Sequence, residues 1–181
     1  PDLRQDKNDP TELAFAWVLD FPLFKKQTEG DFFHGAGKIW GPSHHMFTAP
    51  HTEDLALLDT DPGKVRSYQH DLVLNGFEVG GGSVRIHDPK IQEKIFDLIG
   101  FTKEQKKYFH HMLEAFTYGV PPHGGLAPGI DRLTMLLAGE KNLREVVAFP
   151  LTGDGRDPLM GAPAEVSPEQ LKELGISINE I

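Results

Sequence analysis

The dipeptide Asn75-Gly76 constrains the fold of this chain more than any other local feature, because it stands between two runs of strand-forming residues. Asn-Gly in that setting is typical of a two-residue type I′ turn, in which both turn residues take positive φ. The sequence therefore predicts an antiparallel hairpin with a fixed register. The predicted pairs are Leu74 with Phe77, Val73 with Glu78, and Asp71 with Gly80.

Alternation along this hairpin brings two carboxylates together. Period two places Asp71, Val73 and Glu78 on one face, and makes Asp71 and Glu78 diagonal neighbours on adjacent strands. One interpretation is two solvated carboxylates on an open face of the sheet. The other is a shared Mg2+ ion that bridges to phosphate oxygens, since like charges on adjacent strands are unfavourable without a cation.

Three glycines follow the hairpin and lead to an arginine. Strict alternation sends Arg85 to the face opposite Glu78, so both can line one site only if Gly80 to Gly82 holds a β-bulge. As a binding residue, Arg85 would capture a substrate carboxylate with both arms of its guanidinium. The alternative is a surface arginine, or one paired with an acid such as Asp88.

A second glycine-rich block, residues 123–132, also ends on an arginine. Glycine lets a backbone come close to a ligand, and arginine offers a rigid fork of donors to carboxylate or phosphate. Arg132 falls in the first turn of a predicted helix, where the helix dipole disfavours a cation by ~0.3–1 kcal/mol. It therefore needs an anion. Either a nearby acid such as Asp131 supplies it, or helix N–H groups and Arg132 bind a phosphate together.

The remaining patterns predict an α+β fold. Strands are expected at 15–21, as a buried strand, and at 44–48 and 146–149, with a long hairpin or loop over 25–42. Helices are expected at 52–58, 89–99, 103–118, 130–138 and 168–174, several of them marked by capping residues. If His44 and His45 lie on a strand, their side chains point to opposite faces, so at most one of them faces the site.

Composition narrows the functional classes. The 181 residues, 39% of them hydrophobic, suffice for one core. The chain has no cysteine, which excludes disulfides, thiolate catalysis and Cys-type zinc sites. A formal charge of −9 argues against non-specific binding of nucleic acid over the whole surface, because such binding depends on neutralising phosphates with Lys and Arg. No apolar run reaches the roughly 20 residues of a membrane span and the first ten residues are polar, so we expect a cytoplasmic protein with no membrane partner.

Two of these blocks resemble a known family. The stretches Glu78 to Arg85 (EVGGGSVR) and Gly124 to Leu133 (GGLAPGIDRL) are similar to late signature blocks of class II aminoacyl-tRNA synthetases, the second being their motif 3. Four further stretches narrow the resemblance to bacterial-type aspartyl-tRNA synthetases, and the match covers nearly the whole chain. These stretches are residues 15–22, 44–50, 121–123 and 147–150.

The resemblance implies a class II antiparallel sheet flanked by helices, ATP and Mg2+ as cofactors, and a role for each matched residue. Arg132 would contact the ATP phosphates and, with Glu78, serve catalysis, while Gly129, Ile130 and Asp131 cradle the nucleotide. Asp71 and Glu78 would hold Mg2+ on the ATP. Arg85 and His44 would bind the aspartate substrate, with His45, Ser83 and Gly81 further from it.

The resemblance also implies partners and extent. The substrates would be L-aspartate and tRNA(Asp), with tRNA(Asn) left open, and the full-length enzyme would be a homodimer. Residues 1–181 would form the C-terminal part of the catalytic domain, without the anticodon-binding barrel, motifs 1 and 2 or the inserted domain, and inactive alone. An asparaginyl-tRNA synthetase and a synthetase-like paralogue that does not charge tRNA remain as alternatives.

Overall fold

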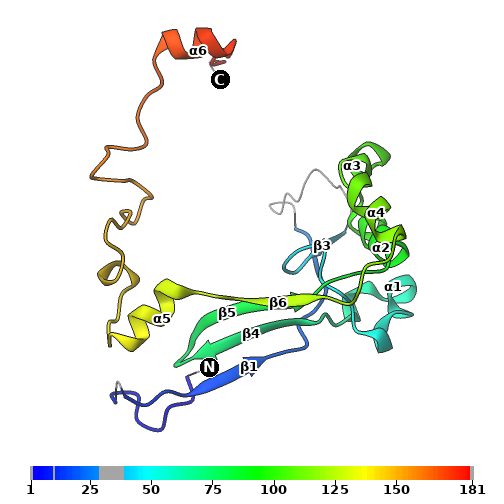
Figure 1. Cartoon of the computed structure of the whole chain (residues 1–181), viewed down its shortest axis with the longest axis horizontal. Coiled ribbons are helices and arrows are strands. Elements are labelled where there is room, and N and C mark those ends of the chain that lie inside the picture. The colour runs from blue at the N-terminus through cyan, green and yellow to red at the C-terminus, as the bar shows by residue number, and fades with distance from the viewer. Residues whose placement is uncertain (1, 10, 29–38, 180–181) are drawn as a thin grey trace. The chain divides into compact units, whose positions relative to one another are not determined.

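The computed structural model describes residues 2–9, 11–28 and 39–179 (Figure 1). The chain divides into two units, Pro1–Leu133 and Thr134–Ile181. The first unit holds both sheets and every residue of the predicted site. Helices and antiparallel strands occur together, which confirms the α+β prediction.

Four antiparallel strands lie side by side in the main sheet, in the order β1-β4-β5-β6 (Figure 1). Their bounds are β1 Phe15–Val18, β4 Gln69–Leu74, β5 Phe77–Val84 and β6 Gly124–Pro128. Strand β6 was not expected, because its glycines and proline are poor strand formers. A smaller sheet pairs β2 (Phe24–Lys26) with β3 (Trp40–Pro42), so the hairpin expected there is confirmed at its base, while residues 29–38 lie outside the described residues.

The predicted turn is confirmed. Asn75 and Gly76 have φ values of 51° and 88°, and the first two pairs, Leu74–Phe77 and Val73–Glu78, are as expected. Beyond Glu78 the predicted register is wrong by one residue. Leu72 pairs with Gly80, and Asp71 pairs with Gly81 instead of Gly80. Val79 is thus the extra residue of a bulge, one position earlier than expected.

The start of helix α5 (Ile130–Leu137) explains the position of this bulge. The carbonyl of Val79 accepts a hydrogen bond from the Gly129 N–H at 2.8 Å, and the carbonyl of Glu78 accepts one from Arg132 Nη1, also at 2.8 Å. Both carbonyls of the bulge are therefore satisfied by the turn that opens α5. The buried side chain of Val79 adds a packing reason for the extra residue.

Asn75 also anchors the edge of the sheet. Its side-chain oxygen accepts a hydrogen bond from Ala14 N at 2.9 Å, and its side-chain nitrogen donates to Glu12 O at 3.0 Å. The residue is buried. The turn amide therefore fixes the segment that leads into β1.

Two glycines, Gly82 on β5 and Gly124 on β6, allow the backbones of these two strands to lie close together. A Cβ on Gly82 would lie 1.9 Å from the carbonyl oxygen of Gly125, and one on Gly124 would lie 2.8 Å from that of Ser83. Real Cβ atoms do not make such contacts. The expectation that the glycines allow close approach to a ligand is thus corrected at these two positions, where the close neighbour is the adjacent strand.

The helix expected at 89–99, which follows β5, is confirmed at both ends. In α2 (Pro89–Ile99), the Asp88 side chain accepts a hydrogen bond from Lys90 N at 2.8 Å, and Gly100 ends the helix with φ 91°. Ile95, Phe96 and Ile99 of α2 are fully buried in the core. The core cluster consists of Leu23, Phe24, Met46, Leu58, Val65, Ile86, Ile95, Phe96, Ile99 and Phe101.

Of the other predicted helices, 168–174 is confirmed as α6 and 130–138 as α5 to within one residue, whereas the helices expected at 52–58 and 103–118 are interrupted. The helix expected over 103–118 is two helices, although the Thr102–Gln105 capping box that starts it is present. The bounds are α3 Lys103–Lys107, α4 His110–Thr117, α1 Leu57–Thr60 and α6 Pro168–Leu174, with 3-10 turns at Thr52–Asp54, Pro62–Lys64 and Leu143–Glu145. Ser167 and Gln170 form the expected box at α6. No helix of the described residues is long and apolar enough to cross a membrane.

Two strand predictions are wrong and a third is right only in part. The stretch 15–21 is a strand only to Val18, and it is not buried, because β1 is an edge strand whose odd-numbered side chains are exposed. Residues 44–48 are not a strand: residues 46 and 47 form a turn, and Thr48 makes only an isolated bridge with Arg85. The Met46 carbonyl in this turn accepts a hydrogen bond from Gln92 Nε2 at 2.9 Å. Residues 146–149 pair with no strand among the described residues, and Val146 ends a 3-10 turn instead.

Candidate active site

The carboxylates of Asp71 and Glu78 converge on one face of the main sheet. A Cβ built on Gly81 would lie 3.0 Å from Glu78 Oε1 and 3.2 Å from Asp71 Oδ1, so both oxygens reach the same point above that glycine. The bulge at Val79 resets the alternation, which then places Ser83 and Arg85 on the same face as Glu78. The condition set by the sequence for a shared site is thus met.

Arg132 joins this pair from the first turn of α5. Its Nη1 lies 3.7 Å from Glu78 Oε2, and the same nitrogen donates to the Glu78 carbonyl oxygen. Both side chains are about half exposed. The nearby acid expected for Arg132 is therefore Glu78, so two predicted site residues meet. Because the ion pair is open to solvent, it is weak and a phosphate could compete for the guanidinium.

Arg85 contacts a histidine rather than an acid. Its Nη1 lies 3.0 Å from His45 Nδ1 and against His45 Nε2. Backbone hydrogen bonds explain the contact, because residues 47–49 run along residues 84–86. The Arg85 N–H also donates to the His123 carbonyl at 2.8 Å, which brings the start of the second glycine-rich block to the end of β5.

The two adjacent histidines have different surroundings. His45 lies against Arg85, whereas His44 packs edge-on against Phe21 with ring centres 4.9 Å apart. Burial lowers the pKa of His45, and the charges of Arg85 and His44 lower it further. A neutral imidazole beside a guanidinium leaves the positive charge of Arg85 available to a carboxylate.

Sequence reasoning missed one member of this face. Gln69 lies two residues before Asp71 on β4, and its Nε2 donates to Asp71 Oδ1 at 3.1 Å. The alternation that paired Asp71 with Glu78 also places Gln69 there, so the pattern could have identified it. Opposite Gln69 lies Ser83, whose fully buried hydroxyl has no hydrogen-bond partner among the described residues.

The nucleotide-cradling turn is only partly open. The Gly129 N–H already donates to Val79, so it does not point to a ligand. Ile130 is exposed and Asp131 lies in the first turn of α5. The phosphate-binding expectation for this turn therefore depends on Arg132 more than on the Gly129 amide.

The donor set suits a hard cation that is shared with a ligand. In the part of the chain that the structure describes, no three His, Asp or Glu side chains gather as a metal site. Mg2+ is usually held by one or two carboxylates, with water and substrate phosphates completing its octahedron. Asp71 and Glu78 supply two carboxylates around the space that a Cβ on Gly81 would fill, which fits that kind of site.

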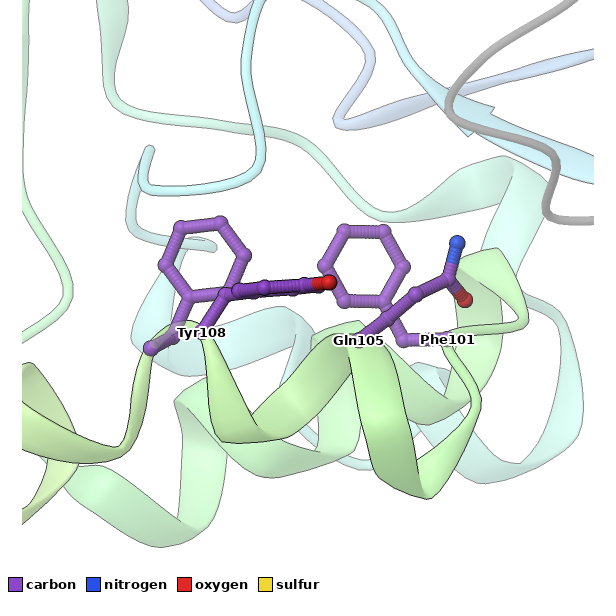
Figure 2. A pocket seen from close by; sticks show the side chains of 4 residues that line it. Phe101, Gln105 and Tyr108 are labelled. Carbon is purple, nitrogen blue, oxygen red and sulfur yellow. The ribbon is translucent and has the colours of Figure 1, made fainter.

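A separate hollow lies among the helices that follow α2. It has a volume of about 280 Å³ and is lined by Phe101, Gln105, Tyr108 and Phe109 (Figure 2). Its aromatic rings pack together, with Phe101 and Phe109 stacked 5.8 Å apart. None of the predicted site residues lines it, and no ionisable acid, lysine, arginine or histidine does either, so it does not serve the chemistry described above.

Comparison with known proteins identifies the family. The family model described as tRNA synthetases class II (D, K and N) matches residues 1–153. The chain belongs to this family, which confirms the resemblance inferred from its two glycine-rich blocks.

Curated relatives extend the comparison. The chain is 52% identical over 171 residues to an aspartate–tRNA(Asp/Asn) ligase of Dehalococcoides mccartyi, covering 94% of this chain and 27% of the relative. It is 49% identical over 174 residues to an aspartate–tRNA ligase of Lysinibacillus sphaericus, covering 96% and 28%. The chain thus spans about a quarter of the length of these relatives.

A solved structure agrees with the fold. The aspartyl tRNA synthetase from Entamoeba histolytica superposes with a TM-score of 0.54 at 26% identity, over 80% of this chain and 24% of that one. The helix and antiparallel-sheet arrangement is thus that of a class II synthetase.

Proposed function

We propose that this chain supplies part of the active site of an aspartate–tRNA ligase. One observation carries the proposal: the bulge at Val79 brings Arg85 to the sheet face that carries Asp71 and Glu78, where Arg132 meets Glu78. The curated relatives with about 50% identity have that activity in their names. The chain corresponds to the C-terminal part of the catalytic domain, so the isolated chain is expected to be inactive.

The proposed reaction has two steps. In the first step the α-carboxylate of L-aspartate attacks the α-phosphorus of ATP, which forms aspartyl-adenylate and releases pyrophosphate. In the second step a terminal hydroxyl of the tRNA attacks the aspartyl carbonyl of the adenylate, which forms aspartyl-tRNA and releases AMP. Such chemistry depends on positioning and on neutralising phosphate charge, without a nucleophilic side chain. It agrees with a site built from arginines and carboxylates.

Each residue has a role in this scheme. Arg132 neutralises phosphate oxygens of ATP, and Asp71 and Glu78 are the residues that would hold Mg2+, which would supply further positive charge to the phosphates. Arg85 binds the side-chain carboxylate of aspartate, and a neutral His45 fixes the guanidinium from one side. His44, assigned to the aspartate pocket from the resemblance, remains a prediction, as do the roles of Gly129, Ile130 and Asp131.

Partners follow from the same proposal. They are L-aspartate and tRNA(Asp), with tRNA(Asn) as a further substrate suggested by the (Asp/Asn) relatives. We also expect a second subunit of the full-length protein as a partner, and a cytoplasmic location. The alternatives are an asparaginyl-tRNA synthetase and a paralogue that does not charge tRNA.

Amino-acid-dependent exchange between ATP and pyrophosphate tests the proposal in the full-length protein. We expect exchange with aspartate and not with asparagine, and a loss of roughly 10²–10³-fold in Arg132→Ala and in Arg85→Ala. Arg156→Ala is the matched control, because Arg156 is an exposed arginine paired with Asp154. Exchange with asparagine alone would favour an asparaginyl-tRNA synthetase. No exchange with either amino acid, from a folded protein, would favour a paralogue that does not charge tRNA. Aminoacylation by residues 1–181 alone would refute the proposal that the rest of the full-length protein is required for activity.

A further inference from the structure

We propose that Gln69 is a positioning residue for the cation site, acting through Asp71. The inference rests on the proposed function, since it assumes that Asp71 holds a divalent cation. It adds to that function a residue that neither the glycine-rich blocks nor the relatives' names identify.

The geometry of β4 carries the inference. Gln69 and Asp71 are two residues apart on one face of the strand, and the amide Nε2 donates to Asp71 Oδ1 at 3.1 Å. Gln69 is only 8% exposed, so its amide is held by its surroundings. Its backbone N–H donates to Ser67 Oγ at 3.4 Å, which fixes the residue further. The donor therefore has one preferred position relative to the carboxylate.

A neutral donor is chemically suited to this task. An amide N–H restrains the rotation of the Asp71 carboxylate and leaves its negative charge in place. A lysine or arginine at position 69 would neutralise that charge. The oxygen that accepts this hydrogen bond, Oδ1, is also the one that reaches the space shared with Glu78 Oε1, and its second lone pair is left for a cation. Carboxylates that bind metals are commonly hydrogen-bonded in this way, and loss of such a partner typically costs 10–100-fold in metal affinity or activity.

The position of Gln69 along the strand adds a second argument. It lies directly across from Ser83 on β5, and Asp71 lies directly across from Gly81. The side chain of Gln69 thus approaches the carboxylate from one end of the strand, while Glu78 approaches the same space from the other. A carboxylate free to rotate would move away from Glu78, because like charges repel. The hydrogen bond opposes that movement.

Two substitutions separate the hydrogen bond from packing. Gln69→Met keeps the length of the side chain and removes the donor, and Gln69→Ala removes both. The probe is Mn2+, titrated into the full-length protein in the presence of a saturating β,γ-methylene analogue of ATP, with free Mn2+ measured by electron paramagnetic resonance. We expect the apparent dissociation constant to rise about tenfold in both variants. Thermal unfolding without Mn2+ checks that each variant is folded.

A kinetic measurement gives an independent readout. In ATP–pyrophosphate exchange, Gln69→Met should raise the half-saturating Mg2+ concentration about tenfold and leave the rate at saturating Mg2+ within about twofold. A purely structural role would lower the rate at every Mg2+ concentration.

Asp71→Asn distinguishes failure of this inference from failure of the proposed function. If Asp71→Asn weakens Mn2+ binding but Gln69→Met does not, Gln69 is not a positioning residue and the cation assignment stands. A shift in Gln69→Ala alone would also overturn the inference, since packing would then be the cause. If Asp71→Asn leaves Mn2+ binding unchanged, both the inference and the cation role of Asp71 are overturned.

Discussion

The two faces of the main sheet are built from the same strands and differ in chemistry. One face carries Gln69, Asp71 and Glu78, with glycine at position 81 between the carboxylates. The opposite face exposes large apolar side chains of three strands, namely Phe15, Trp17, Phe77, Val84 and Leu126. The difference shows how one sheet can place its carboxylates on one side: the turn at Asn75 sets Asp71 and Glu78 on that face, and the bulge at Val79 brings Arg85 to it.

The apolar face is unusual for a surface. On β1 and its flanks the odd-numbered residues Leu13, Phe15, Trp17 and Leu19 are all exposed, while Ala16 and Val18 between them are half-buried. Contiguous apolar patches of this kind mark surfaces that are covered in the functional molecule. Because the chain spans about a quarter of its relatives' length, much of their sequence lies outside it. The polar face, in contrast, needs exposure to admit a ligand.

Gly82→Ala should have the largest effect, because the new Cβ would meet the Gly125 carbonyl oxygen at 1.9 Å. We expect the chain to lose ~1–3 kcal/mol or more of unfolding free energy as β5 and β6 separate. Urea unfolding followed by circular dichroism measures this. Gly125→Ala is the control, since nothing lies within 4 Å of its Cβ position. Equal stability of the two variants would contradict the close approach of the strands.

Gly81→Ala tests the polar face one residue away. Its Cβ would enter the space between Glu78 Oε1 and Asp71 Oδ1. We expect affinity for Mn2+ in the full-length protein to fall about tenfold, or ~1.4 kcal/mol, with unfolding little changed. The comparison of the faces would fail if Gly81→Ala destabilised the fold as much as Gly82→Ala and left Mn2+ binding intact.

Phe15→Lys tests the apolar face. Phe15 is 55% exposed on an edge strand, so the substitution should change unfolding free energy by less than about 0.5 kcal/mol. A lysine there should reduce self-association of the 181-residue chain through this face, because it interrupts the apolar row. Size-exclusion chromatography with light scattering gives the measurement. Ala16→Lys, on the other face of β1, should not reduce association; an equal reduction would argue against a sided surface.

His45→Gln should give the smallest effect, and only in acid. Because the pKa of His45 is lowered in the folded chain, the unfolded chain binds a proton first as pH falls below about 6.5, and folded stability decreases from there toward the folded pKa. The variant should therefore lose less stability than the wild type between pH 7 and 5. Urea midpoints at several pH values test this, and parallel pH profiles would show that His45 titrates normally.

Local patterns predicted the elements whose determinants lie within a few residues. The turn at Asn75 and the caps at Asp88, Thr102 and Ser167 depend on neighbours no more than three positions away. The convergence of Asp71 and Glu78 followed from the same turn. Propensity failed where a distant residue decides, as at 44–48, where the Met46 carbonyl in a turn meets Gln92.

The parts of the site that escaped prediction depend on distant contacts. The bulge at Val79 is set by the N–H of Gly129, and the ion pair of Arg132 joins residues 54 positions apart. Strand β6 forms because its glycines accept a close neighbour, which propensity counts against it. Gln69 is the exception, because alternation alone places it beside Asp71.

The side chain of Asn75 has a consequence for the order of folding. The β4–β5 hairpin needs only local contacts, whereas β1 joins it through hydrogen bonds that span 61 and 63 residues of sequence. The amide that receives Ala14 and Glu12 adopts its position only when the turn has formed. Since non-local pairing must first offset the entropy of closing a long loop, we expect the hairpin to form early and β1 to dock late. Strand β1 should thus also separate from the sheet before the β4–β5 hairpin opens.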